Sequence, residues 1–198
     1  MKKKIFLGIF ALAVVFQANA QDKTINFGFK VAPAIAWLDI DDHNVKSDGS
    51  VPKCNWGFFG IWNFTKNFSL VSGFNINSLG GNYKTLTEKN KIRLSEFEIP
   101  AAFQMRTDNI KNFKFYVQIG LAGAYIFKAK DKDDKDLFDN NDARHINTSY
   151  FVTAGTEYAV TGGVSLIGQL KYNGGFTSVM DTDKMKANFV ELGLGVMF

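Results

Sequence analysis

The side chains best suited to chemistry in this sequence are carboxylates, amines and amides at alternate positions within otherwise apolar stretches. They are Lys30, Glu96, Glu98, Gln118, Glu157, Gln169, Lys171 and Glu191. An ionised group removed from water needs a partner, so we expect Glu and Lys of this set to pair in a network. Such a network suits either an ion path or a polar filling that fixes strand register, and a narrow interior favours the filling.

A second candidate is the acidic segment 131–142, which has enough carboxylates for a calcium site because Ca²⁺ takes six to eight oxygen ligands. Lys132 and Lys135 interrupt it, Lys130 precedes it, and no glycine supplies the sharp turn of an EF-hand loop. We therefore read this segment as a solvated charged loop and assign no metal ligand.

Catalytic and cofactor motifs are weak. An acyl hydrolase would pair a base, His43 or His145, with a serine, but Ser47, Ser50 and Ser149 are expected from composition alone. The lone Cys54 reads as a space-filling residue, and no glycine-rich phosphate loop leads from a strand into a helix. We predict no catalytic residue and no cofactor.

The elements that carry these residues show a two-residue period, so i, i+2 and i+4 share one face of a strand. In the first segment Phe27, Val31 and Ile35 lie on an apolar face, and Lys30 lies on the small or polar one. The alternation recurs in eight segments: 24–37, 55–64, 68–77, 96–105, 113–127, 147–160, 164–173 and 190–198.

The connections between these segments alternate in length. They are short at 65–67, 107–112 and 161–163, and long and polar near 39–53, 80–90, 128–146 and 174–186. Segments of about ten residues are long enough to cross a bilayer as tilted strands. The pattern predicts an all-β fold, an eight-stranded antiparallel up-and-down transmembrane β-barrel over residues 21–198.

Threading the segments up and down gathers the outward aromatic residues at two levels, as expected for the two membrane interfaces. One group is expected at the short-turn end: Phe27, Phe64, Phe68, Phe103, Phe113, Tyr158 and Phe198. The other is expected near the long loops: Trp37, Trp56, Tyr125, Phe127, Tyr150 and Tyr172. The polar set that includes Glu96 then faces the lumen, and outer-membrane lipid is the expected partner of the outer face.

The first residues predict export. Three lysines, an apolar run from Ile5 to Phe16 and Ala18-Asn19-Ala20 form a cleavable signal peptide, residues 1–20. The formal net charge of +4 falls to +1 when the three lysines are removed. This near balance disfavours nucleic acid as a partner, and we expect localisation in the outer membrane.

With these motifs in place, the chain resembles the PorT-like, or porin-family, outer-membrane β-barrel domain and is similar in build to small OmpX-type barrels. The resemblance rests on four runs: 98–102 (EIPAA), 116–128, 155–158 (GTEY) and 170–175 (LKYNGG). The family that this resemblance implies includes components of secretion machinery as well as many barrels of unassigned role. Phe198 resembles the terminal aromatic signal that is read by the barrel assembly machinery.

Our working hypothesis is a non-enzymatic integral barrel with a structural, assembly or extracellular-loop binding role, and with an extracellular or envelope protein as partner. One alternative is a soluble lipocalin-like binder of a small apolar ligand, which requires an apolar interior and a polar exterior. The other is a narrow pore, although eight strands leave little room beyond their own side chains.

Overall fold

Alternation of bulky apolar residues with small or polar ones shapes most of the chain into long strands. The computed structural model describes residues 24–41, 45–85, 89–138, 143–160, 163–180 and 185–198. No helix in these ranges is long and apolar enough to cross a membrane. The strands are β1 (Ile25–Ile40), β2 (Val45–Ser47), β3 (Val51–Asn63), β4 (Phe68–Thr85), β5 (Lys89–Arg106), β6 (Phe113–Lys130), β7 (Ile146–Ala159), β8 (Ser165–Gly175) and β9 (Met185–Met197).

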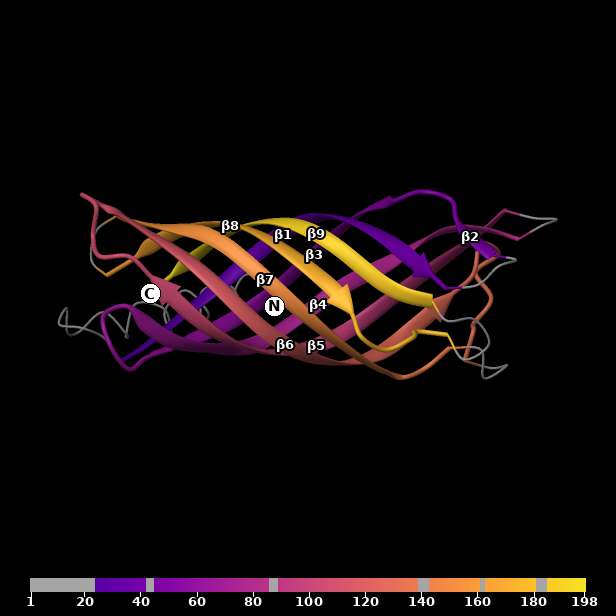
Figure 1. Ribbon diagram of the computed structural model, residues 1–198, viewed down its shortest axis with the longest axis horizontal. Coiled ribbons are helices and arrows are strands. Elements are labelled where there is room, and N and C mark those ends of the chain that lie inside the picture. The colour runs from indigo at the N-terminus through magenta and orange to yellow at the C-terminus, as the bar shows by residue number, and fades with distance from the viewer. Residues whose placement is uncertain (1–23, 42–44, 86–88, 139–142, 161–162, 181–184) are drawn as a thin grey trace, which may run out of the picture.

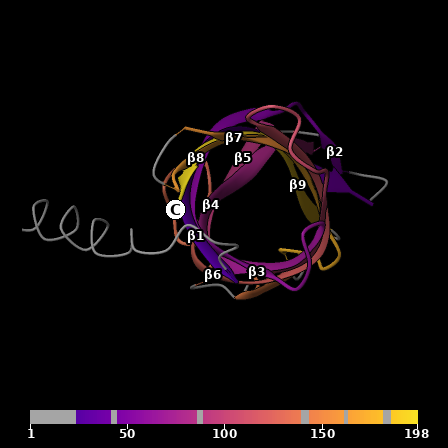
Figure 2. The ribbon, with the colours of Figure 1, turned by 90° about the vertical axis from the view of Figure 1, so that its left-hand side faces the viewer.

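Eight of these strands close into an antiparallel barrel. Their order around the wall is β1, β3, β4, β5, β6, β7, β8 and β9, and β9 pairs back onto β1. Figure 2 looks along the barrel and shows the strands as a ring. A closed wall has no free edge, as a sheet in hydrocarbon requires. The predicted eight-stranded up-and-down barrel is confirmed.

The two ends of the barrel differ in their connections. Residues 64–67, 107–112 and 160–164 join strands at one end, where the C-terminus also lies (Figure 1). Residues 41–50, 131–145 and 176–184 join them at the other end. Short turns mark the periplasmic end of outer-membrane barrels and long loops the extracellular end. The predicted signal peptide, residues 1–20, and His43 lie outside the described residues.

The prediction of a long polar loop near residues 80 to 90 was wrong. β4 continues to Thr85 and β5 begins at Lys89, with Lys84 paired to Lys89. The strands continue because Leu79, Ile92 and Leu94 maintain an apolar inner face beyond the lipid-facing part of the wall. β2, which pairs with the end of β4, is also an element that the sequence did not predict within 39–53.

The outer face of the barrel is apolar. Ile119 on β6 is 66% exposed and Leu194 on β9 is 63% exposed, and both lie on strand faces opposite to buried polar residues. A soluble lipocalin-type barrel has the reverse arrangement, with apolar residues inside. These side chains therefore suit contact with acyl chains.

The extracellular end of the lumen contains an apolar core, which we call the outer plug. It is formed by inward side chains from six strands, by Val45 of β2 and by parts of two loops. Its largest members include Leu38, Leu79, Ile92, Leu94, Ile126, Val179, Met185 and Phe189. Because these strands stand around most of the wall, their side chains meet across the lumen and fill its outer end.

Candidate functional site

Two ion pairs lie in the lumen below the outer plug. Lys30 Nζ on β1 donates to Glu191 Oε1 on β9 at 2.7 Å. Lys171 Nζ on β8 donates to Glu98 Oε1 on β5 at 3.2 Å. All four residues are buried, so each charge depends on its partner to offset its loss of hydration.

Asparagine amides complete the coordination of the buried carboxylates. Glu98 accepts from Asn75 Nδ2 at 2.6 Å and from Asn77 Nδ2 at 3.0 Å. Glu96, which has no lysine hydrogen bonded to it among the described residues, accepts from Asn77 at 3.1 Å and from Asn147 at 2.9 Å. Charge-assisted hydrogen bonds of this kind are stronger than neutral ones and suit a low-dielectric interior.

The other three predicted lumen residues have partners outside the two ion pairs. Gln118 Nε2 donates to Gln104 Oε1 at 2.7 Å, and the Tyr116 hydroxyl donates to Gln169 Oε1 at 2.9 Å. Glu157 lies 4.0 Å from Arg106 Nη1. The structure therefore joins Lys30 to Glu191 and Lys171 to Glu98, and Asn77 links Glu98 to Glu96. Gln118, Glu157 and Gln169 line the same cavity as Lys30 and Lys171 but have other partners.

The space left inside the barrel is small beside the charged group and wider at the periplasmic end. A cavity of about 40 Å³ is lined by residues that include Lys30, Lys171 and Phe151. A polar vestibule of about 470 Å³ lies near the short turns, beside Arg106 and Asn63. The small cavity is roomy enough for ordered water but not for a solute. The arrangement can hold charges and bind water, and the outer plug fills the lumen above it.

The aromatic residues expected at the interfaces lie on the outer face, with Trp37 and Phe198 only partly exposed. Near the short turns, Phe113 and Tyr158 are 4.8 Å apart between ring centroids. Nearer the long loops, Trp37 and Tyr172 are 6.3 Å apart. Trp56 instead contacts Phe29 and Phe58, which begin a row that continues through Phe74 to Phe97.

The weaker chemical candidates that lie among the described residues do not come together as a site. Ser149 lies in the lumen and accepts from Asn173 Nδ2 at 3.2 Å. The His145 ring is exposed and stacks on Tyr125 and Phe138 at centroid distances of 5.5 and 4.2 Å. Within the described ranges, no group of three or more His, Cys, Asp or Glu residues could hold a metal. Asp139 and Asp142 lie outside these ranges.

Sequence reasoning missed two sets of residues around the lumen. The first is the asparagine shell of the carboxylates, although Asn55, Asn75 and Asn77 fall on inward positions of the alternation. The second is the outer plug, signalled by Leu79, Ile92 and Leu94 at inward positions beyond Asn77 and Glu96. In both cases the alternation of inward and outward positions along the strand could have identified these residues.

Comparisons with known proteins agree with this geometry. A family model, the outer membrane protein beta-barrel domain, matches residues 8–198. Among solved structures, Neisserial surface protein A is 17% identical with a TM-score of 0.57, covering 86% of this chain and 95% of that one. OprG from Pseudomonas aeruginosa is 14% identical with a TM-score of 0.49, covering 86% and 95%. No curated protein matches the chain.

The chain belongs to the outer membrane protein beta-barrel domain family and is an integral protein of the bacterial outer membrane. At 17% identity, the likeness to Neisserial surface protein A is one of fold. Fold alone does not assign a task, because unrelated functions share one architecture.

Proposed function

We propose that this protein is a non-enzymatic, non-conducting barrel that acts through its extracellular end, as a binding or structural component of the envelope. The observation that carries the proposal is the filled lumen. Leu38 and Phe189 both belong to the outer plug, and the Lys171–Glu98 ion pair crosses the interior below it. Because the interior of the barrel is filled, its two ends and its lipid-facing surface are the parts available for contact with other molecules.

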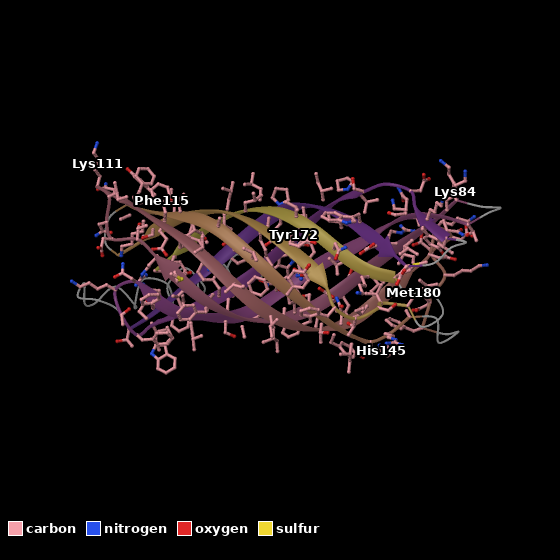
Figure 3. All side chains as sticks on the ribbon, viewed as in Figure 1. Lys84, Lys111, Phe115, His145, Tyr172 and Met180 are labelled. Carbon is pink, nitrogen blue, oxygen red and sulfur yellow. The ribbon has the colours of Figure 1, made fainter. Side chains whose placement is uncertain are left out.

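The extracellular end supplies surface for such contact. The outer halves of β4 and β5 stay paired to Lys84 and Lys89, and β2 adds to their edge. Figure 3 shows Lys84 at this end and Lys111 at the opposite end. Binding functions concentrate on projecting segments held by a rigid scaffold.

The sequence supports two finer assignments. The runs at 98–102 and 170–175 favour the PorT-like branch of the family, and residues 1–20 favour export with a cleaved signal peptide. Phe198 exchanges two backbone hydrogen bonds with Phe27, so the residue expected to be read by the assembly machinery also closes the barrel.

Site-specific photocrosslinking in intact cells tests the proposal. A photoreactive residue replaces the exposed Lys84, and a matched one replaces the exposed Lys66 in a periplasmic turn. We expect protein or glycolipid adducts from position 84 that are absent from position 66. Adducts confined to position 66 would contradict contact through the extracellular end. Stable conductance steps from the purified barrel in planar bilayers would contradict the filled lumen.

A further inference from the structure

A basic patch lies on the outer wall of β5 and β6, above the lipid-facing aromatic residues. On β5, Lys91 and Arg93 occupy the same strand face as Phe97. On β6, Lys128 and Lys130 pair with Ser95 and Arg93 across the ladder, so they share that outward face. Ile92, Leu94 and Ala129 between them are buried, as inward residues should be.

The change from aromatic to basic residues occurs within a few positions. Phe97 pairs with Tyr125, and both are exposed on the lipid-facing side. The next outward pairs toward the outside are Ser95 with Lys128 and Arg93 with Lys130. Aromatic residues favour the membrane interface, so these cations stand at the level of the lipid headgroups, on the same side of the wall.

Three of these cations line a depression in the wall. The depression has a volume of about 160 Å³, and its lining is Arg93, Lys128 and Lys130 with Lys53 of β3, Ser78, Leu94, Ser95 and Asp134. Lys53 also lies within electrostatic range of Lys91 and Arg93. Four cations around one small depression repel each other, and an anion seated among them would relieve that repulsion.

Asp134 is the anion that contacts these cations in the structure, and it does not satisfy every donor of Arg93. Asp134, an exposed loop residue, lies 3.1 Å from Arg93 Nη2 and 3.7 Å from Lys130 Nζ. Arg93 Nη2 also donates to the carbonyl oxygen of Asp131 at 3.1 Å. The buried Nε of Arg93 has no hydrogen-bond acceptor in the part of the chain that the structure describes. A guanidinium with a free donor beside two lysines matches the oxygen geometry of a phosphate.

We propose that this patch binds the phosphate groups of a phosphorylated lipid in the outer leaflet. The outward direction of the patch and its position directly above Phe97 and Tyr125 favour a membrane lipid over a dissolved anion. Asp134 competes with the phosphate for Arg93 and Lys130 in this arrangement. This lipid site does not depend on a protein partner at the extracellular end.

The test uses the folded full-length chain in mixed micelles, with lipid retention measured by native mass spectrometry. The separate titrants are bisphosphorylated lipid A, the same lipid without phosphates, and inorganic phosphate. We expect lipid A to bind, the dephosphorylated lipid to bind far more weakly, and added salt to weaken lipid A binding. Equal retention of the two lipids would overturn the proposal. Inorganic phosphate that competes at concentrations similar to those of lipid A would overturn the assignment to a lipid.

Matched variants locate the site. Lys128→Gln with Lys130→Gln should weaken lipid A binding on the order of tenfold. Asp134→Asn should strengthen it about threefold by removing the competing carboxylate, and asparagine suits the φ of 62° at this position. The control, Lys66→Gln with Lys111→Asn, removes the same charge at the periplasmic end. An equal loss in the control would overturn the assignment, and heat-modifiable gel migration confirms that each variant is folded.

Discussion

Lys171 of β8 and Glu98 of β5 form a salt bridge of 3.2 Å across the lumen, between strands separated by β6 and β7 on the shorter path around the wall. The Lys171 ammonium also lies 4.5 Å from the centre of the Phe151 ring. One ion pair thus ties opposite walls of the barrel.

Replacing Lys171 with methionine should destabilise the barrel by about 3–5 kcal/mol, because Glu98 would remain as a buried carboxylate without its cation. Urea unfolding in micelles, followed by tryptophan fluorescence, measures the change. The double variant Lys171→Met with Glu98→Gln should recover much of the loss. If the single and double variants lost equal stability, packing of the lysine stem rather than pairing would explain the effect.

Ile119→Arg should cost about 2–4 kcal/mol of folding stability in lipid vesicles, because this residue lies midway between the outward aromatic residues Phe113 and Tyr125. Folding titrations into phosphatidylcholine vesicles measure the cost. Ser47→Arg, at an exposed position of β2, serves as the control and should be nearly neutral. A neutral Ile119→Arg would be inconsistent with an acyl-chain environment at this position.

Gly80→Ala should destabilise the outer half of β4 by about 1–3 kcal/mol, because glycine at this position has a φ of 129°. An added Cβ would also overlap the carbonyl oxygen of Ile92. Gly123→Ala is the matched control, since no atom lies within 4 Å of the position of its Cβ. Urea midpoints of the two variants are compared, and equal midpoints would show that the positive φ of Gly80 imposes no constraint on the residue type.

Leu38→Ala should destabilise the barrel by about 2–5 kcal/mol by opening a cavity in the outer plug. The conductance of the purified protein in planar bilayers should stay unchanged, because the ion pairs below the plug still fill the lumen. Val31→Ala, on the outer face of the same strand, gives the matched control and a smaller loss. Conductance steps from Leu38→Ala would show that the plug alone closes the barrel.

The barrel itself follows from the two-residue period, and the short turns were located within a residue or two. The two-residue alternation also placed Glu98 and Lys171 on the inner faces of their strands, because an ionised group cannot face hydrocarbon. It could not predict which groups would pair, since Lys171 meets Glu98 only through the offset of strands three positions apart. The sequence analysis also missed the β4–β5 extension, because Asn82 and Lys84 are residue types typical of loops. Leu79 and Ile92 of this hairpin pack in the outer plug.

The seam between β1 and β9 joins the earliest and the latest strands of the described chain, from Gly28 with Met197 to Ile40 with Met185. Until β9 (Met185–Met197) has been synthesised, both β1 and β8 would expose unsatisfied backbone groups along one edge. Hydrocarbon penalises such groups heavily, and in water they invite aggregation. Stable insertion therefore has to wait for the last strand, and a chain that ends early has no stable inserted form.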